Sequence, residues 1–244
     1  MAHVREFMSS RTAPQRAAAG ILRALLAADQ RSGRARLAIP GGSALQVMAG
    51  LLAALPEAAR RRLALTWVDE RCVPVDDPAS NHGEAMRAGL VPADCARVLP
   101  LWSDDAGPTE ARARVAAGLA ADFADGLDVA LLGLGEDGHI ASLFPGHPAL
   151  ASGDPVLHIP DSPKPPPGRM TLGLSLLRRA GLCVVLALGE GKREALLRLR
   201  RGDAALPASA LGRLIVFTDQ QGLEGFTDLD SLLNPPTDPR GVMR

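Results

Sequence analysis

Residues 128–139, which read DVALLGLGEDGH, decide the fold of this chain. After Asp128 comes a continuous apolar run, which is typical of a strand buried on both faces. Similar runs occupy residues 36–39, 63–68, 182–188 and 213–218. Between them the apolar residues follow helical spacing, as in residues 43–55, where one face carries Leu45, Met48, Leu51, Leu52 and Leu55. This alternation predicts an α/β fold with a doubly wound, mostly parallel sheet and helices on both faces.

The sequence is that of one domain. Its 244 residues contain no internal repeat and no linker-like change of composition, and 47% of them are hydrophobic, which is enough for a sizeable core. We expect a single α/β domain over residues 1–226. Residues 1–28 are expected to supply its first helix rather than a transit peptide, and residues 227–244 a poorly ordered tail.

Residues 160–168, PDSPKPPPG, have the composition of a linker. Consecutive prolines fix φ and favour extended polyproline geometry, so we expect a stiff arm that holds Lys164 and Arg169 in place. Beyond this arm, Ser175 is expected to cap a short helix that ends before Gly181.

Charge and cysteine content exclude several functions. Lysine plus arginine and aspartate plus glutamate both number 27, so no overall field attracts nucleic acid or an anionic membrane. No apolar run reaches the roughly 18 residues of a membrane-spanning helix. The three cysteines have no C-x-x-C spacing, so they indicate neither a disulfide framework nor a zinc site. We expect a cytoplasmic protein with neither nucleic-acid nor membrane partners.

Four polar loops follow the predicted strands directly. They are Pro40-Gly41-Gly42-Ser43, Asp69-Glu70-Arg71, Gly135-Glu136-Asp137-Gly138-His139 and Gly189-Glu190-Gly191-Lys192. In open parallel sheets, ligands bind beyond the carboxyl ends of the strands, where loops gather and helix N-termini point inward. We therefore expect the four loops to share one edge and to form one site.

Two of these loops have features of an anion site. The Gly41-Gly42-Ser43 turn lacks bulky side chains and precedes a predicted helix, so its N–H groups could bind phosphate, with Lys192 reaching the same anion. The alternatives are a tight turn with Ser43 as an ordinary N-cap and a solvated lysine. Arg71 and Arg169 offer forked donors to phosphate or to an oxyanion, although a single arginine near acidic residues is more often a surface ion pair.

His139 is the candidate general base. It follows a buried strand, and a neutral imidazole there could accept a proton from water. A lone histidine is normally structural, but the glycine-rich acidic loop around it favours catalysis. We interpret the remaining histidines as structural: His3, His82, His147 and His158.

The sequence gives less support to dinucleotide binding, to a serine or cysteine nucleophile and to a metal site. Gly133-Leu-Gly135-Glu-Asp-Gly138 matches the dinucleotide pattern G-x-G-x-x-G, but Pro145 and Pro148 interrupt the long helix that such a site requires. No G-x-S-x-G elbow of a serine hydrolase is present. Cys72 beside Arg71 is more readily a buried filler than a nucleophile. No metal-ligand spacing is found, so no metal and no cofactor are expected.

The sequence resembles the 6-phosphogluconolactonase family between about residues 37 and 197. The resemblance rests on three strings in the same order: Trp67-Val-Asp-Glu-Arg-Cys-Val-Pro74 with Ser80-Asn81 following, Gly135-Glu-Asp-Gly-His-Ile-Ala-Ser-Leu-Phe-Pro-Gly146, and Ser162-Pro-Lys-Pro-Pro-Pro-Gly-Arg-Met-Thr171. It implies a Rossmann-like sheet and hydrolysis of 6-phosphogluconolactone without a metal or cofactor. His139 would activate water, while Arg71, Arg169 and Lys192 would bind the anionic substrate.

We hypothesise that different residues of the site bind the two ends of the substrate. The phosphate is expected at Gly41, Gly42, Ser43, Lys164, Arg169 and Lys192, and the lactone carbonyl beside His139 and Arg71, with Asp137 or Asp69 orienting the imidazole. Two alternatives remain. The related glucosamine-6-phosphate deaminases share several motifs but carry Asn-Glu-Pro after the histidine loop, where this chain has Ser142-Leu143-Phe144-Pro145. A phosphosugar-binding regulator would need no His139. We expect a monomer or a weak homo-oligomer.

Overall fold

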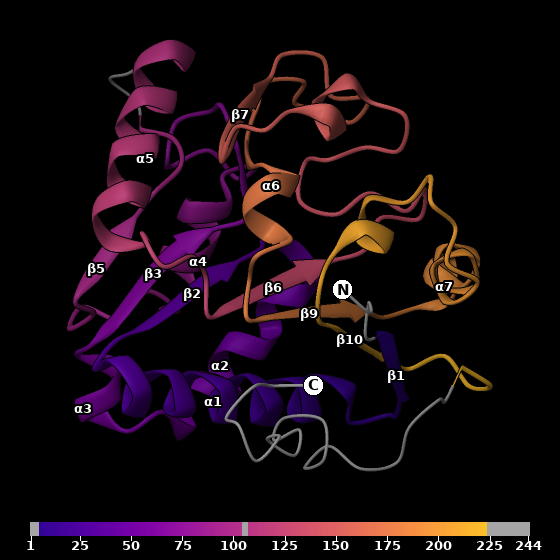
Figure 1. Cartoon of the computed structure of the whole chain (residues 1–244), viewed down its shortest axis with the longest axis horizontal. Coiled ribbons are helices and arrows are strands. Elements are labelled where there is room, and N and C mark those ends of the chain that lie inside the picture. The colour runs from indigo at the N-terminus through magenta and orange to yellow at the C-terminus, as the bar shows by residue number, and fades with distance from the viewer. Residues whose placement is uncertain (1–4, 104–106, 224–244) are drawn as a thin grey trace, which may run out of the picture.

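A computed structural model describes residues 5–103 and 107–223. Its centre is a seven-stranded sheet of order β1-β10-β9-β6-β2-β3-β5, in which every neighbouring pair is parallel (Figure 1). The strands are β1 (Arg5–Ser9), β2 (Ala35–Ile39), β3 (Leu63–Trp67), β5 (Arg97–Leu99), β6 (Val129–Gly133), β9 (Leu182–Ala187) and β10 (Leu214–Thr218). The predicted α/β class and parallel sheet are confirmed.

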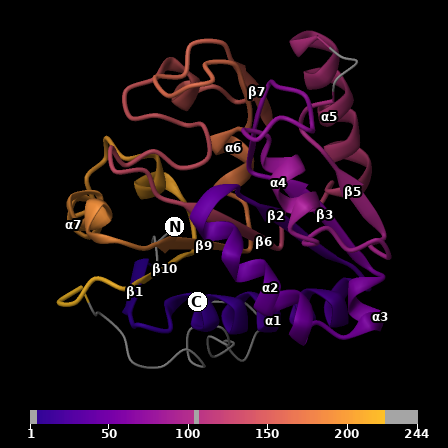
Figure 2. The same cartoon turned by 180° about the vertical axis from the view of Figure 1, so that it is seen from behind.

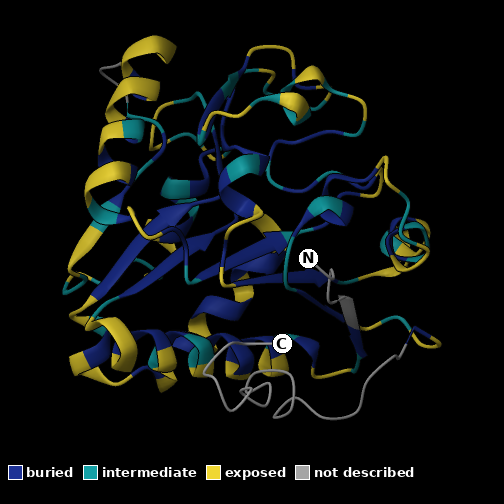
Figure 3. Ribbon diagram, in the orientation of Figure 1, coloured by how far each residue is buried: buried dark blue, intermediate teal, exposed yellow. Residues whose placement is uncertain are grey.

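The central strands form because their residues are apolar on both faces. All residues of β2, β3, β9 and β10 are buried, and Trp67 and Phe217 are among the largest fully buried side chains (Figure 3). Burying such side chains stabilises the fold by about 1.5–3 kcal/mol each. The five predicted strands are found with ends that differ from the prediction by at most a residue.

Helices cover both faces of this sheet. They are α1 (Ala13–Ser32), α2 (Val47–Ala54), α3 (Glu57–Arg60), α4 (Asn81–Arg87), α5 (Pro108–Asp122), α6 (Leu174–Leu177) and α7 (Arg193–Arg200). The short 3-10 helices are η1 (Gly42–Gln46), η2 (Pro148–Ala151), η3 (Glu190–Lys192) and η4 (Pro207–Ala210). Helices α1 and α2 pack together on one face, and α5 lies on the other (Figures 1 and 2). No helix of the described residues is long and apolar enough to span a membrane.

The expected first helix is found as α1, although it begins only at Ala13, with Pro14 in its first turn, and follows the unpredicted strand β1. Two local predictions were wrong. The helix expected from Ser43 begins as the 3-10 helix η1, with Gly41 at its N-cap, and becomes α-helical at Val47. Ser175 lies inside α6, whose N-cap is Gly173, and its Oγ donates to the Asp154 carbonyl. The expected tail over residues 227–244 lies outside the described residues.

A second, antiparallel sheet was not predicted. It contains β4 (Asp69–Arg71), β8 (Arg169–Leu172) and β7 (Val156–Ile159), in the order β4-β8-β7. Residues expected as a loop after β3 therefore pair with the segment after the proline-rich arm. In this register Arg71 lies directly opposite Arg169. The small sheet thus brings two guanidinium groups from distant parts of the sequence together.

The arm at residues 160–168 doubles back instead of extending. The Ser162 N–H donates to the Pro167 carbonyl at 3.1 Å, so the two ends of the arm meet. The Ser162 hydroxyl also donates to the Lys164 carbonyl at 3.0 Å. The prediction of an extended polyproline arm is therefore wrong, because these hydrogen bonds and those from Arg169 close the segment into a loop.

Candidate active site

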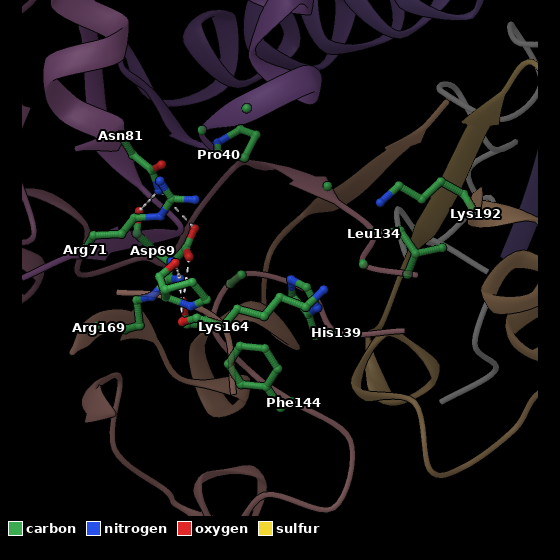
Figure 4. A pocket seen from close by; sticks show the side chains of 17 residues that line it. Pro40, Asp69, Arg71, Asn81, Leu134, His139, Phe144, Lys164, Arg169 and Lys192 are labelled. Atoms are coloured by element: carbon green, nitrogen blue, oxygen red, sulfur yellow. Dashed lines mark hydrogen bonds between the residues drawn. The ribbon is translucent and has the colours of Figure 1, made fainter. Parts of the chain in front are cut away.

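A cleft of about 330 Å³ opens at the carboxyl edge of the main sheet (Figure 4). The loops after β9, β6, β2 and β3 all contribute to it, and these strands are consecutive neighbours in the sheet. The volume lies at the small end of the range for small-molecule sites, which is about 300–1,000 Å³. Of the predicted site residues, the lining includes Gly41, Gly42, Asp69, Arg71, His139, Lys164, Arg169 and Lys192.

His139 is hydrogen-bonded to Asp137 at one side of this cleft. The distance between His139 Nδ1 and Asp137 Oδ1 is 2.6 Å. Because the carboxylate can only accept, Nδ1 carries the proton in the neutral ring and Nε2 keeps a free lone pair. The close approach depends on Gly135, where a Cβ would lie 2.0 Å from His139 Nδ1. The loop therefore presents to the cleft an imidazole whose tautomer is set by its neighbour Asp137.

The surroundings keep this imidazole uncharged. Burial lowers the pKa of His139 below its ordinary value; the Asp137 carboxylate opposes this effect, and the Lys164 ammonium adds to it. The pKa of Asp137 is also lowered, since the His139 hydrogen bond and nearby positive charge outweigh its partial burial. The Phe144 ring packs on the imidazole with 4.7 Å between centroids. A neutral histidine next to an ionised aspartate is the arrangement that general-base catalysis needs.

Asp69 has other partners than His139. Its Oδ2 accepts from the Ser142 hydroxyl at 2.6 Å, and its main-chain oxygen accepts from the Asn81 amide at 2.9 Å. The sequence left open whether Asp137 or Asp69 orients the imidazole. In the structure, Asp137 is the one that contacts it.

Side chains of helix α4 contact the Gly41-Gly42 turn after β2. The Gly42 N–H donates to Glu84 Oε2 at 2.8 Å, so a carboxylate already occupies one amide of the expected phosphate turn. Asn81 packs against Gly41 so closely that a Cβ there would lie 1.9 Å from the amide oxygen. Ser43 is exposed, makes no side-chain cap and is not part of the cleft lining.

Arg71 and Arg169 line the cleft and also donate hydrogen bonds to carbonyl groups of nearby loops. Arg169 is 5% exposed and donates to the carbonyls of Pro166, Pro165 and Lys164 at 2.8, 3.0 and 3.1 Å. Burial lowers its pKa, and the neighbouring Arg71 adds to the effect. Arg71 Nη1 donates to the Ala79 carbonyl at 2.5 Å, whereas its buried Nε has no partner among the described residues. Much of Arg169 is therefore used to shape the proline-rich loop.

The cleft is locally positive although the whole chain is neutral. Arg71, Lys164, Arg169 and Lys192 line it, and Asp69 is the single carboxylate among the described lining residues. Lys164 Nζ lies 3.6 Å from Asp137 Oδ1. Figure 4 shows Lys192 on the opposite side of His139 from the Arg71 and Arg169 pair. Such a concentration of positive charge favours an anionic ligand.

Glu70 and Asn81 lie near the site, and the sequence analysis assigned neither of them a role. The buried Glu70 carboxylate accepts from the N–H groups of Arg71, Asn81 and His82, each at 2.7 Å. Burial raises its pKa, and those three hydrogen bonds oppose the rise. Glu70 thereby joins β4 to the start of α4, which carries Asn81. The Ser80-Asn81 pair after the Asp-Glu-Arg string was the available signal.

The structure also bears on alternative chemistries. Burial raises the pKa of the Cys72 thiol to about 11, which does not suit a nucleophile. After β6 no helix begins between Leu134 and His147, so the glycine pattern there does not form a dinucleotide site. Within residues 5–103 and 107–223, histidine, cysteine, aspartate and glutamate do not gather in groups of three that could hold a metal ion.

Comparisons with known proteins place the chain in a family. The sequence profile described as Glucosamine-6-phosphate isomerases/6-phosphogluconolactonase matches residues 9–215. The chain belongs to this family. The 6-phosphogluconolactonase of Rattus norvegicus is 35% identical over 215 residues, covering 81% of this chain and 83% of the relative. That of Mycobacterium tuberculosis is 38% identical and covers 81% and 87%.

Solved structures agree with this membership. A 6-phosphogluconolactonase from Shewanella baltica superposes with a TM-score of 0.76 at 25% identity, covering 89% of this chain and 97% of that one. A monomeric glucosamine-6-phosphate deaminase shares the fold, with a TM-score of 0.68 at 20% identity, covering 93% of this chain and 99% of that one. The family resemblance stated from the sequence is confirmed, and the curated relatives named here carry the lactonase name.

Proposed function

We propose that this protein hydrolyses 6-phospho-D-glucono-1,5-lactone to 6-phospho-D-gluconate, the second step of the oxidative pentose phosphate pathway, with water activated by His139. One observation carries the proposal: a neutral imidazole, bonded to Asp137 at 2.6 Å, borders a cleft that four cationic side chains also line. A lactone that bears a phosphate needs both features, a base for water and positive charge for the anion.

The hydrolysis follows from the tautomer of His139. Nε2 takes a proton from water as the water oxygen bonds to the lactone carbonyl carbon, and Asp137 stabilises the imidazolium that forms. Arg71 or loop N–H groups stabilise the oxyanion. When the carbonyl re-forms, the bond from that carbon to the ring oxygen breaks, and the imidazolium returns its proton to the ring oxygen. The base is thereby regenerated for the next cycle.

The phosphate binds to the cationic part of the cleft. Lys192 contacts it directly beside the Gly41-Gly42 turn, and Arg169 contributes mainly its charge because its donors hold the proline-rich loop. Binding of this remote group serves to orient the carbonyl at His139. Since Ser43 is exposed outside the lining residues, we leave it out of the phosphate site.

Replacing the base tests the mechanism. We expect His139→Ala to lower kcat by about 10²–10⁴-fold, the usual contribution of a general base, with KM changed much less. His158→Ala, a change of the same kind on β7 outside the cleft, is the matched control and should keep full activity. The assay is acidification of a freshly made 6-phosphogluconolactone solution, run with and without a chelator. A kcat within threefold of wild type would reject His139 as the base.

The same preparation separates the two alternatives. Ammonia release from glucosamine 6-phosphate would indicate a deaminase, and saturable phosphosugar binding without turnover would indicate a regulator. Phe144 and its neighbours supply no carboxylate at the position where the deaminases carry Asn-Glu-Pro, which favours the lactonase.

We further propose that the protein acts in the cytoplasm as a monomer or a weak homo-oligomer. Its three cysteines, Cys72, Cys95 and Cys183, are free thiols, as suits a reducing compartment. Its balanced charge offers no attraction to nucleic acid. Cell fractionation and light scattering of the purified protein test these two points, and recovery in a membrane fraction or as a stable large assembly would contradict them.

A further inference from the structure

One oxygen atom of Asp137 interacts with two partners. Oδ1 accepts the His139 Nδ1 proton at 2.6 Å, and the Lys164 ammonium lies 3.6 Å from the same atom. We propose that Lys164 is a positioning residue for the reaction, which acts through Asp137 to hold the Asp137–His139 pair in its working geometry and to set the acid–base behaviour of His139. The kinetic part of this inference rests on the proposed function.

The main chain of Lys164 is fixed by its own loop. Its N–H donates to the Ser162 hydroxyl at 3.2 Å, and its carbonyl accepts from that hydroxyl at 3.0 Å. Arg169 on β8 donates to the same carbonyl and to those of Pro165 and Pro166. Because Arg169 is buried and belongs to a paired strand, the starting point of the lysine side chain is held relative to the sheet. The ammonium is thereby directed to Asp137, as Figure 4 shows for the side chain running toward His139.

The charges around the imidazole come from three elements. Asp137 belongs to the same loop, Lys164 to the proline-rich loop and Asp69 to β4, while Phe144 adds an uncharged ring. Burial is the largest influence and lowers the pKa of His139; the two carboxylates raise it, and Lys164 lowers it. Removing the ammonium takes away one of the two influences that lower this pKa, so burial alone opposes the carboxylates. The imidazolium is then favoured, so His139 becomes protonated, and inactive as a base, at a higher pH than in the wild type.

A plain substrate contact would behave differently. If Lys164 only bound the phosphate, its loss would raise KM and leave the titration of His139 unchanged. Lys192 provides the comparison, because it lines the same cleft but no ion pair or hydrogen bond joins its ammonium to Asp137 or His139 in the described structure. The side chain of Lys164 is 44% exposed, so solvent screens its charge and the shift is expected to be moderate.

The test compares Lys164→Met, Lys164→Arg and Lys192→Met. Two quantities are measured: the pH dependence of kcat/KM, and the titration midpoint of the His139 ring protons by NMR in the unliganded protein. For Lys164→Met we expect the acid limb and the NMR midpoint to move upward together by about one pH unit, at the low end of the range for a charge within a few ångströms. Lys164→Arg should restore most of this shift, and Lys192→Met should raise KM while leaving both midpoints in place.

The NMR titration midpoint of His139 tests the role of Lys164 independently of the proposed function. If the protein hydrolyses no lactone, the proposed function fails, yet the midpoint of His139 still tests Lys164. A midpoint in Lys164→Met within about 0.2 pH units of wild type would overturn the inference, because a neighbouring charge normally shifts a pKa by more than this. An equal upward shift in Lys192→Met would overturn it as well, since the effect would then belong to the whole cleft. If Lys164→Met does not fold, Lys164→Gln takes its place with the same expectations.

Discussion

At Gly135, the addition of a single methyl group should strongly impair catalysis. A Cβ at this residue would lie 2.0 Å from His139 Nδ1 and 2.4 Å from Asp137 Oδ1. An ordinary contact to a Cβ is 3.4 Å or more, so Gly135→Ala must displace the imidazole, the carboxylate or both by more than an ångström. These are side-chain atoms beside an open cleft, so they can move without unfolding the loop. The expected result is a folded protein in which His139 and Asp137 are separated.

The magnitude follows from the displacement. Moving a catalytic group by about 1 Å costs on the order of 10²-fold in rate, and complete loss of a general base costs about 10²–10⁴-fold. We therefore expect Gly135→Ala to lower kcat by at least about 10²-fold, within that range, while KM changes by less than about threefold because the phosphate contacts lie elsewhere. Thermal unfolding should shift by only a few degrees, as is usual when about 1 kcal/mol is lost.

The assay is again acidification of fresh lactone, with a melting curve for each variant. Gly153→Ala is the matched control, because a Cβ there meets no atom within 4 Å and its φ is not in the positive range. It should leave kcat and the melting temperature unchanged. A Gly135→Ala enzyme that folds and retains kcat within threefold of wild type would refute the reasoning, since the imidazole would then work without its hydrogen bond to Asp137.

Two further predictions concern residues around the cleft. Glu84→Gln should lower KM about two- to fivefold, because it removes a negative charge next to the Gly42 N–H. Such charge effects at backbone donors are worth roughly 0.3–1 kcal/mol. A raised KM would show instead that the carboxylate is needed to shape the turn. Cys72→Ser should keep kcat within twofold. Iodoacetamide at pH 7 should not inactivate the wild-type enzyme, because burial raises the pKa of this thiol to about 11. Rapid inactivation of the wild type that is absent in Cys72→Ser would contradict this prediction.

The sequence was sufficient to predict the sheet and the convergence of the loops. A continuous apolar run such as residues 182–188, with a glycine on each side, is typical of a strand that is covered on both faces, and parallel strands place their carboxyl ends at one edge. The loops that carry Gly41, His139 and Lys192 therefore had to meet. No feature beyond local pattern and general topology was needed for that step, and the cleft contains all three.

The details that failed depend on specific strand pairing and hydrogen bonds, which the periodicity of the sequence does not encode. Asp69-Glu70-Arg71 has no strand-like pattern and becomes β4 only because β8 pairs with it. The proline-rich loop doubles back because Arg169 and Ser162 bind its carbonyl groups, and no local rule specifies such contacts. The Gly42 N–H is taken by Glu84, 42 residues further along the chain. Side-chain hydrogen bonds of this kind are decided by packing and cannot be read from periodicity.

Phe144, next to His139, favours the proposed lactonase over a deaminase. In the related deaminases a carboxylate precedes the proline after the histidine loop, whereas here Phe144 precedes Pro145 and stacks on His139. A carboxylate at that place would face the imidazole and favour its cationic form. The phenyl ring instead brings no charge, so burial still lowers the pKa of His139 although Asp137 and Asp69 oppose this effect. The proposed hydrolysis requires an imidazole that begins the cycle uncharged, and the apolar neighbour favours that state.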